Sequence, residues 1–311
     1  MNVPVPPPRP VDLSVTLGSL TLANPVMPAS GCFGPELGDL IALDRLGALV
    51  TKTIFYDSRS GNPAHRLAET PGGMLNSVGI PSPGMAGFRS SVLPRYTSFD
   101  SPVIVSVGGL SQHEYWDVID NLDDQPIAAF ELNVSCPNLE KGGLEIGTDP
   151  REVEEVTRGA VQRTRRPIFV KLTPNVTRID EIAKAAEAGG AAAVTVANTF
   201  VGMQIDIERR TAILGNTIGG VSGPAIKPMA LYLVYTVAQA VGIPVIGCGG
   251  ICSTSDALEF LMAGAAAIQV GTATFGRPET MIQIIDQLPE AFAAHNETTA
   301  AHFTGSLVAA A

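Results

Sequence analysis

The sequence predicts an α/β fold of the (β/α)8 barrel type, and three observations predict it. Short apolar runs rich in Val, Ile and Ala recur along the 311 residues and end in polar or glycine residues, which is typical of parallel strands buried on both faces. A stretch of helical character follows each run, as the crossovers of a parallel sheet require. The composition, with 45% hydrophobic residues, 32 Gly and 24 Pro, suits a large core joined by many tight turns.

Eight runs are expected to form the strands, which is the number that closes such a barrel. In chain order they are NPVMPAS (24–30), GALVTKTI (47–54), PVIVSVGG (102–109), AAFELNVS (128–135), PIFVKLTP (167–174), AAAVTVANT (191–199), PVIGCGGI (244–251) and AAIQVGTAT (266–274). Helices are expected to begin after Ser111, Asp149 and Ser253, whose side chains can cap a first turn, and the last of these helices is expected to end at Gly264.

One domain covering residues 1–311 is expected, because barrels of this kind reach about 250 residues or more as a single unit. It begins with a proline-rich lead of about ten residues, MNVPVPPPRP. Two connections, at about 55–82 and about 200–224, exceed the usual loop length. Long loops that follow barrel strands commonly carry function, so both are expected to contribute to the site.

Charge and cysteine spacing exclude several classes of function. The chain has 20 Lys and Arg against 30 Asp and Glu, a formal charge of −10, so no broad basic surface is expected for a nucleic acid. No run approaches about 18 apolar residues and the N-terminus lacks a signal-peptide core, which predicts a cytoplasmic protein without a membrane segment. The four cysteines have neither CxxC nor zinc spacing, which predicts reduced thiols and no metal site.

Lysines occupy two of the predicted strand ends, and the active site of such a barrel lies at the carboxyl ends of its strands. These residues are Lys52 and Lys171. A buried ammonium group is costly unless it meets an anion, so the pair favours a site for an anionic ligand. The alternative is that each lysine extends to solvent or pairs with a structural carboxylate such as Glu131.

Glycine clusters end the seventh and eighth strands, at 247–250 and at 271–272. The loops that follow these strands commonly bind phosphate through backbone N–H groups, and glycine lets the backbone approach a ligand closely. Gly223, near the end of the second long connection, could add a further amide. The sequence therefore favours a phosphate cradle here, although the same glycines could serve only to make tight turns.

Cys136 is the candidate general base. It precedes a proline, lies between Asn133 and Asn138, and is expected near the two lysines, which would increase its thiolate character. The alternative is a small buried hydrophobic residue, the role expected for most of the other cysteines, Cys32, Cys248 and Cys252. The four histidines are all expected away from the strand ends, so Cys136 is also favoured by elimination.

A set of motifs resembles class 1 dihydroorotate dehydrogenases from about residue 11 to about residue 290. The motifs are KT (52–53), NSVGI (76–80), NVSCPN (133–138), VKLTPN (170–175), ANT (197–199), GCGGI (247–251) and VGTA (270–273). Their order agrees with that family, and so does their placement at predicted strand ends. The combination is therefore specific, although each motif alone is short.

The resemblance implies an FMN-dependent oxidation of dihydroorotate to orotate in pyrimidine synthesis. Cys136 would remove the C5 proton while FMN takes the hydride from C6, and Lys171 would face the flavin edge where negative charge grows. The implied FMN contacts are Ala29, Ser30, Lys52, Thr53, Ser106, Asn133, Lys171, Ala197, Gly223, Gly249, Gly250, Gly271 and Thr272. The implied substrate contacts are Lys52, Asn76, Ser77, Val78, Gly79, Ile80, Asn133, Asn138, Asn198 and Thr199.

The segment LEKGGLEIGTDP (139–150) resembles subclass B. Members of that subclass pass electrons to NAD through a separate subunit that carries FAD and a [2Fe–2S] cluster, which implies a homodimeric core within a heterotetramer. The cysteines here lack the spacing to hold such a cluster. Three alternatives stay open: the fumarate-dependent subclass A, another pyrimidine reductase such as dihydropyrimidine dehydrogenase or tRNA dihydrouridine synthase, and a flavin-binding barrel without catalysis.

Overall fold

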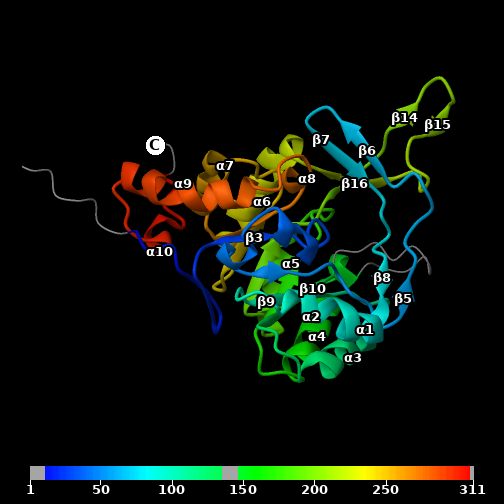
Figure 1. The fold of residues 1–311 in the computed structure, drawn as a ribbon, viewed down its shortest axis with the longest axis horizontal. Helices are drawn as coiled ribbons and strands as arrows, with labels where there is room; N and C mark the ends of the chain where they lie inside the picture. The colour runs from blue at the N-terminus through cyan, green and yellow to red at the C-terminus, as the bar shows by residue number, and fades with distance from the viewer. Residues whose placement is uncertain (1–10, 135–145, 309–311) are drawn as a thin grey trace, which may run out of the picture.

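The structure, a computed structural model, describes residues 11–134 and 146–308 (Figure 1). The predicted base Cys136 and the predicted substrate contact Asn138 lie outside the described residues, as does the proline-rich lead. Within the described ranges, no helix is both long enough and apolar enough to cross a membrane.

Eight parallel strands form one curled sheet, so the predicted fold class is confirmed. They are β3 (Val26–Pro28), β4 (Leu49–Val50), β9 (Val103–Val107), β10 (Ala129–Asn133), β11 (Ile168–Lys171), β12 (Ala193–Val196), β17 (Val245–Cys248) and β18 (Ala265–Val270). Their hydrogen-bonded order is β3-β18-β17-β12-β11-β10-β9-β4. The two edge strands meet where the N–H of Gly47 donates to the carbonyl of Val26 at 2.9 Å. Each of the eight predicted runs coincides with one of these strands, although β18 begins one residue before its predicted run, at Ala265.

The longer helices follow the strands around the outside of the barrel (Figure 1). They are α3 (Gln112–Leu122), α4 (Pro150–Val161), α5 (Ile179–Ala188), α6 (Lys227–Ala238), α7 (Thr254–Met262) and α9 (Thr280–Ala294). The three predicted starts are confirmed, since Ser111, Asp149 and Ser253 each accept a hydrogen bond from a backbone N–H of the first turn. Gly264 follows α7 with a φ of 112°, a conformation that glycine adopts readily.

Short helices replace a long one after the first two barrel strands. Between β3 and β4 the chain forms only the 3-10 turns η1 (Pro35–Asp39) and η2 (Leu43–Arg45), and between β4 and β9 it forms α1 (Gly84–Gly87), η3 (Phe88–Val92) and α2 (Leu93–Tyr96). The other short helices are η4 (Ile146–Thr148), η5 (Pro224–Ile226), α8 (Ala273–Gly276) and α10 (Ala300–Phe303). The expected helical stretch after each strand is therefore present only as short helices after β3 and β4.

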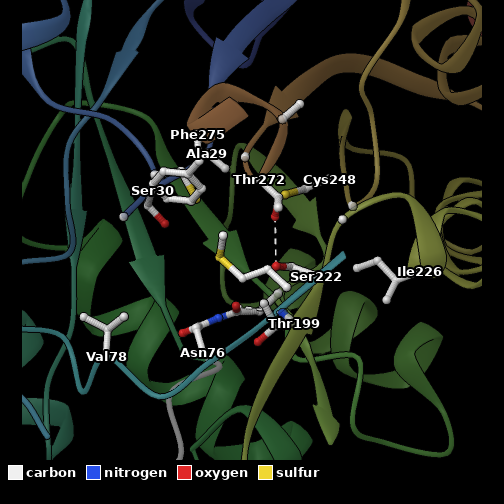
Figure 2. A pocket seen from close by; sticks show the side chains of 18 of the residues that line it. Ala29, Ser30, Asn76, Val78, Thr199, Ser222, Ile226, Cys248, Thr272 and Phe275 are labelled. Atoms are coloured by element: carbon white, nitrogen blue, oxygen red, sulfur yellow. Dashed lines mark hydrogen bonds between the residues drawn. The ribbon is translucent and has the colours of Figure 1, made fainter. Parts of the chain in front are cut away.

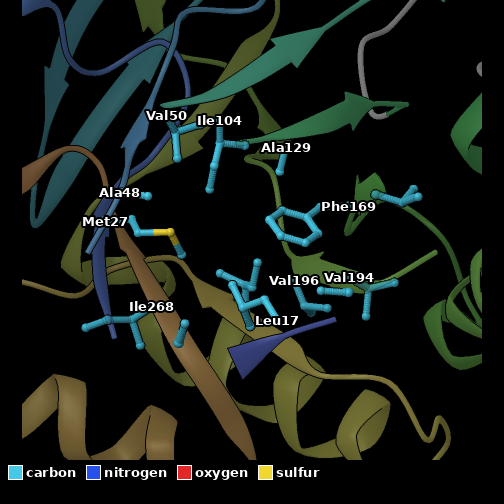
Figure 3. Close-up of a cluster of buried hydrophobic side chains, with 14 of the residues drawn as sticks. Leu17, Met27, Ala48, Val50, Ile104, Ala129, Phe169, Val194, Val196 and Ile268 are labelled. Carbon is cyan, nitrogen blue, oxygen red and sulfur yellow. The ribbon is translucent and has the colours of Figure 1, made fainter. Parts of the chain in front are cut away.

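The core fills the barrel and the layer between strands and helices. An N-terminal hairpin of β1 (Val15–Leu17) and β2 (Leu20–Leu22) contributes to it, because Leu17 is fully buried among residues of the barrel strands (Figure 3). Figure 3 shows Met27, Phe169 and Ile268 from three different strands in the same cluster. The apolar core lies below the level at which the strands end in polar residues, which leaves that end open for a site.

The two long connections form a small sheet of their own. It consists of β13 (Phe200–Gly202), β16 (Gly219–Ser222), β7 (Gly73–Asn76) and β6 (Leu67–Thr70), in that order and antiparallel throughout. The hairpin of β14 (Ile205–Asp206) and β15 (Thr211–Ala212) extends from this sheet (Figure 1). A further pair is formed by β5 (Ser58–Arg59) and β8 (Ser82–Pro83). Because β7 and β16 pair with each other, the two connections form one structure.

Candidate active site

A cavity of about 270 Å³ opens at the carboxyl ends of the barrel strands (Figure 2). Residues from the strand ends line one side and residues from the β13-β16-β7-β6 sheet line the other. The predicted site residues that line it are Ala29, Ser30, Lys52, Thr53, Asn76, Val78, Gly79, Ile80, Asn133, Lys171, Ala197, Asn198, Thr199, Gly223, Gly249, Gly250, Gly271 and Thr272. The structure thus brings together residues that are up to about 240 positions apart in the chain, as the barrel fold requires.

Two predicted contacts lie behind the cavity wall. Ser106 is fully buried, and its hydroxyl is 2.9 Å from that of Thr53, which itself accepts a hydrogen bond from the Asn133 side chain at 3.0 Å. Ser77 is also buried, and its carbonyl accepts a hydrogen bond from the Asn62 amide. Both serines are therefore placed to support residues that face the cavity, without lining it themselves.

Lys171 lies at the floor of the cavity with 3% of its surface exposed. Its ammonium group donates to the side-chain oxygen of Gln269 at 2.8 Å and lies 3.8 Å from the Cys248 sulfur. Burial acts to lower the pKa of Lys171, but the nearby acid groups Cys248, Glu131 and Cys32 outweigh burial, so its pKa lies above the ordinary value. The lysine is therefore a fixed positive charge that faces the cavity.

The glycine clusters form one wall of the cavity, at the ends of β17 and β18. Gly249 and Gly250 have φ angles of 136° and 77°, and Gly223 has a φ of 96°, a region that L side chains rarely adopt. A Cβ at Gly223 would lie 2.7 Å from the Gly73 Cα. Within the described residues, the N–H groups of Gly250 and Thr272 have no hydrogen-bond acceptor. This donor set fits an anionic group such as phosphate.

Carboxamides gather at the opposite side of the cavity, where Lys52 is exposed. The Asn198 side chain donates to the Asn133 side-chain oxygen at 3.5 Å and accepts from the N–H of Thr199 at 2.8 Å. The Asn76 side chain donates to the carbonyl of Gly220 at 3.2 Å. A flat polar ligand would meet fixed donors and acceptors together with a cation on this side.

The three described cysteines, which were expected mostly to be small buried hydrophobic residues, all line the cavity. Burial raises the pKa of the Cys32 thiol to about 11, an effect that the charge of Lys171 only partly offsets. Burial likewise raises the pKa of Cys248. Burial also raises the pKa of Cys252, and its hydrogen bond to Asp256 adds to this. These thiols are thus poor bases near neutral pH, and the predicted base Cys136 lies outside the described residues.

Sequence reasoning missed several residues of the site, above all Gln269 of β18. Gln269 is fully buried and contacts both Lys171 and Glu131. The available signal was a polar residue in the middle of the apolar run AAIQVG, because a buried amide requires partners. Met74, Ser222 and Phe275 also line the cavity and were not singled out.

Comparisons with known proteins agree with this geometry. The sequence model of a family described as Dihydroorotate dehydrogenase matches residues 12–292. A protein of Alkaliphilus metalliredigens named "Dihydroorotate dehydrogenase B (NAD(+)), catalytic subunit" is 48% identical over 278 residues, which cover 89% of this chain and 92% of that protein. A protein of the same name from Geobacter sp. (strain M21) is 44% identical over 299 residues, covering 95% of this chain and 98% of that protein. The chain belongs to the dihydroorotate dehydrogenase family.

Proposed function

We propose that this protein oxidises (S)-dihydroorotate to orotate in the synthesis of pyrimidines, with FMN bound in the cavity at the barrel mouth. The observation that carries the proposal is the arrangement of this one cavity. A buried cation at its floor, a glycine cradle on one wall and carboxamides on another match the three parts that the reaction needs. Family membership and the names of the relatives support the same activity.

Residues of the cavity fit FMN. The N–H groups of Gly250 and Thr272 would hold its phosphate, because they are donors without protein acceptors in the described chain. Lys171 would bind the flavin edge that gains negative charge, since its ammonium group is buried and charged at the floor. Bound FMN would supply the acceptor for the hydride that leaves C6 of the substrate.

The chain's own residues would bind the substrate and remove its proton. Lys52 and the carboxamides of Asn76 and Asn198 would hold the carboxylate and the ring carbonyl and N–H groups of dihydroorotate. Cys136 would take the proton from C5 as the general base. That residue lies outside the described residues, so its role rests on the sequence and on the raised pKa of the thiols that the structure does describe.

Electrons would leave through a second subunit. The relatives are named as catalytic subunits of an NAD(+) enzyme, and the resemblance to subclass B implies a partner with FAD and a [2Fe–2S] cluster. We propose the same arrangement here, with two copies of this chain at the centre of a heterotetramer.

Anaerobic addition of dihydroorotate to the purified, FMN-loaded protein tests the proposed activity. The flavin absorbance should decrease and orotate should form in equal amount, because hydride transfer consumes one oxidised flavin per substrate. A preparation that holds FMN but does not lose its colour with dihydroorotate would contradict the proposal and favour a binding protein without this activity. Reduction by another pyrimidine alone would instead indicate a different reductase.

A further inference from the structure

Three buried polar side chains form a chain of hydrogen bonds beneath the cavity. Glu131 of β10 has no exposed surface, Gln269 of β18 is 1% exposed, and Lys171 of β11 is 3% exposed. The Gln269 amide nitrogen donates to Glu131 Oε2 at 2.6 Å, and the Gln269 oxygen accepts from the Lys171 ammonium at 2.8 Å. Thr195 of β12 donates to the same Glu131 oxygen at 2.9 Å. Four strands of the barrel therefore meet in one network.

The two charged ends fix the direction of the Gln269 amide. A carboxylate only accepts hydrogen bonds and an ammonium group only donates them. With its NH₂ toward Glu131 and its oxygen toward Lys171, Gln269 satisfies both partners. The flipped amide would place oxygen against carboxylate and NH₂ against ammonium, which buried groups do not tolerate.

Glu131 balances the charge of Lys171 without touching it. No ion pair within 4.0 Å joins them, both being described residues, because Gln269 lies between. Burial has the largest effect on the pKa of Lys171 and lowers it, whereas the Cys248 thiol on β17, Glu131 and the Cys32 thiol after β3, in that order, raise it. Burial raises the pKa of both thiols, and Glu131 is the one carboxyl group among the three, so we take Glu131 as the group whose negative charge acts on Lys171.

We propose that Glu131 and Gln269 are positioning residues that hold Lys171 charged and directed into the cavity. Gln269 sets the direction of the ammonium group, and Glu131 supplies the buried charge that keeps it protonated. The inference rests on the proposed function, because it assumes that FMN is the group that Lys171 meets. It adds two residues, neither of which lines the cavity, to those that determine how the flavin is held.

The pH dependence of FMN binding by the apoprotein tests this proposal without any turnover. Glu131→Gln keeps an oxygen that can accept from Thr195 and Gln269 but removes the charge. Burial should then dominate, so that Lys171 loses its proton at a lower pH. We expect FMN affinity, measured by quenching of flavin fluorescence, to be nearly constant from about pH 7 to about pH 9.5 in the parent protein. In Glu131→Gln it should fall at least about tenfold over that range, which requires the pKa of Lys171 to be displaced downward by about two units or more.

Two further variants separate charge from packing. Thr195→Val removes one hydrogen bond to Glu131 but not the charge of Glu131. The FMN affinity of this variant should therefore stay nearly constant from about pH 7 to about pH 9.5, as in the parent protein. Gln269→Met keeps both charges and the side-chain size but removes the bridge, so FMN should bind more weakly at every pH. If Glu131→Gln follows the parent curve, or if Gln269→Met binds FMN as the parent does, the proposed roles are wrong. A parent protein that does not bind FMN at all would overturn the proposed function itself, which keeps the two failures distinct.

Discussion

Gly220 shapes the proposed substrate side of the cavity because it has no side chain. A Cβ at this position would lie 2.0 Å from the Thr199 hydroxyl oxygen and 2.7 Å from its Cβ. The carbonyl of Gly220 also accepts the hydrogen bond from the Asn76 side chain. The positions of Asn76 and Thr199, two proposed substrate contacts, thus both depend on this one glycine of β16.

Gly220→Ala should therefore weaken substrate binding by displacing Thr199. We expect the KM for dihydroorotate and the Kd for orotate to rise by roughly three- to tenfold, the effect of about one hydrogen bond, while FMN content stays at the parent level. Gly276→Ala is the matched control, because a Cβ there meets nothing within 4 Å. Equal KM values for the two variants would remove Gly220 from the substrate site.

Replacement of Cys136 by alanine should separate binding from chemistry. FMN and orotate should still bind, whereas flavin reduction by dihydroorotate should slow by roughly 10² to 10⁴, the usual contribution of a general base. Cys136→Ser should keep partial activity that is shifted to higher pH. Rapid-mixing spectroscopy measures the rate, and Cys32→Ala, which removes a thiol with a pKa of about 11, should change it far less. Reduction at the parent rate by the alanine variant would exclude Cys136 as the base.

Single residues were predictable from sequence where they end a strand. Lys171 and Gly249 follow apolar runs directly, and in a barrel every such end reaches the same mouth. Gln269 was missed because it lies inside a strand, where its partners come from other strands and no local pattern shows them. Ser106 was expected in the site from the family resemblance but lies behind Thr53, because side-chain direction depends on the strand's position in the barrel.

Elements that depend on their own residues were predictable from sequence, whereas a sheet that depends on pairing between distant segments was not. The barrel strands were found because strands buried on both faces are apolar throughout. The sheet over the mouth was expected only as two long loops. Its pairing joins Asn76 to Gly220 and Leu75 to Val221, and a pairing between positions about 145 residues apart leaves no periodic signal in either segment.

Asp256 links the helices that flank the glycine cradle. It accepts hydrogen bonds from Lys227 of α6 at 2.7 Å and from Ser253 and Cys252 at 2.8 Å and 3.1 Å. A Cβ at Gly250 would lie 2.8 Å from the Lys227 Cβ, so α6 packs directly against the cradle. Burial acts to raise the pKa of Asp256, but the hydrogen bonds, that from Lys227 first, outweigh burial and lower it to about 2.

The stability contributed by Asp256 should depend on pH. Because its folded pKa is lower than the unfolded value of 3.8, the contribution is complete above that value and is lost as the pH falls toward about 2. Asp256→Asn should therefore lower the free energy of unfolding by about 2 kcal/mol near neutral pH, and the difference from the parent should narrow near pH 3. Urea titrations at both pH values measure it. Asp286→Asn, which removes the exposed partner of Arg45, should have little effect at either pH.

The molecule as a whole carries apolar surface at the same end as the cavity. Val201, Met203, Ile205 and Ile207 are all more than half exposed, and Ile207 is 80% exposed. They lie on β13, in the β14-β15 hairpin and in the link between the two, and Figure 1 shows the place of these elements. Phe275, which lines the cavity, is also exposed. Exposed apolar groups of this kind commonly mark a protein contact, and their place beside the mouth suits the proposed subunit that would accept electrons from FMN.

The isolated chain should accordingly reduce dyes with dihydroorotate but should not reduce NAD. The sequence has no dinucleotide fingerprint of the GxGxxG type opening a helix, and its cysteine spacing does not suit an iron–sulfur cluster. Co-expression with a subunit that carries FAD and a [2Fe–2S] cluster should restore NADH formation, measured at 340 nm. The same complex made with Cys136→Ala should form NADH at least about 10² times more slowly, because the electrons must then come from the impaired site. Fast reduction of fumarate by the isolated chain would instead place the protein in subclass A.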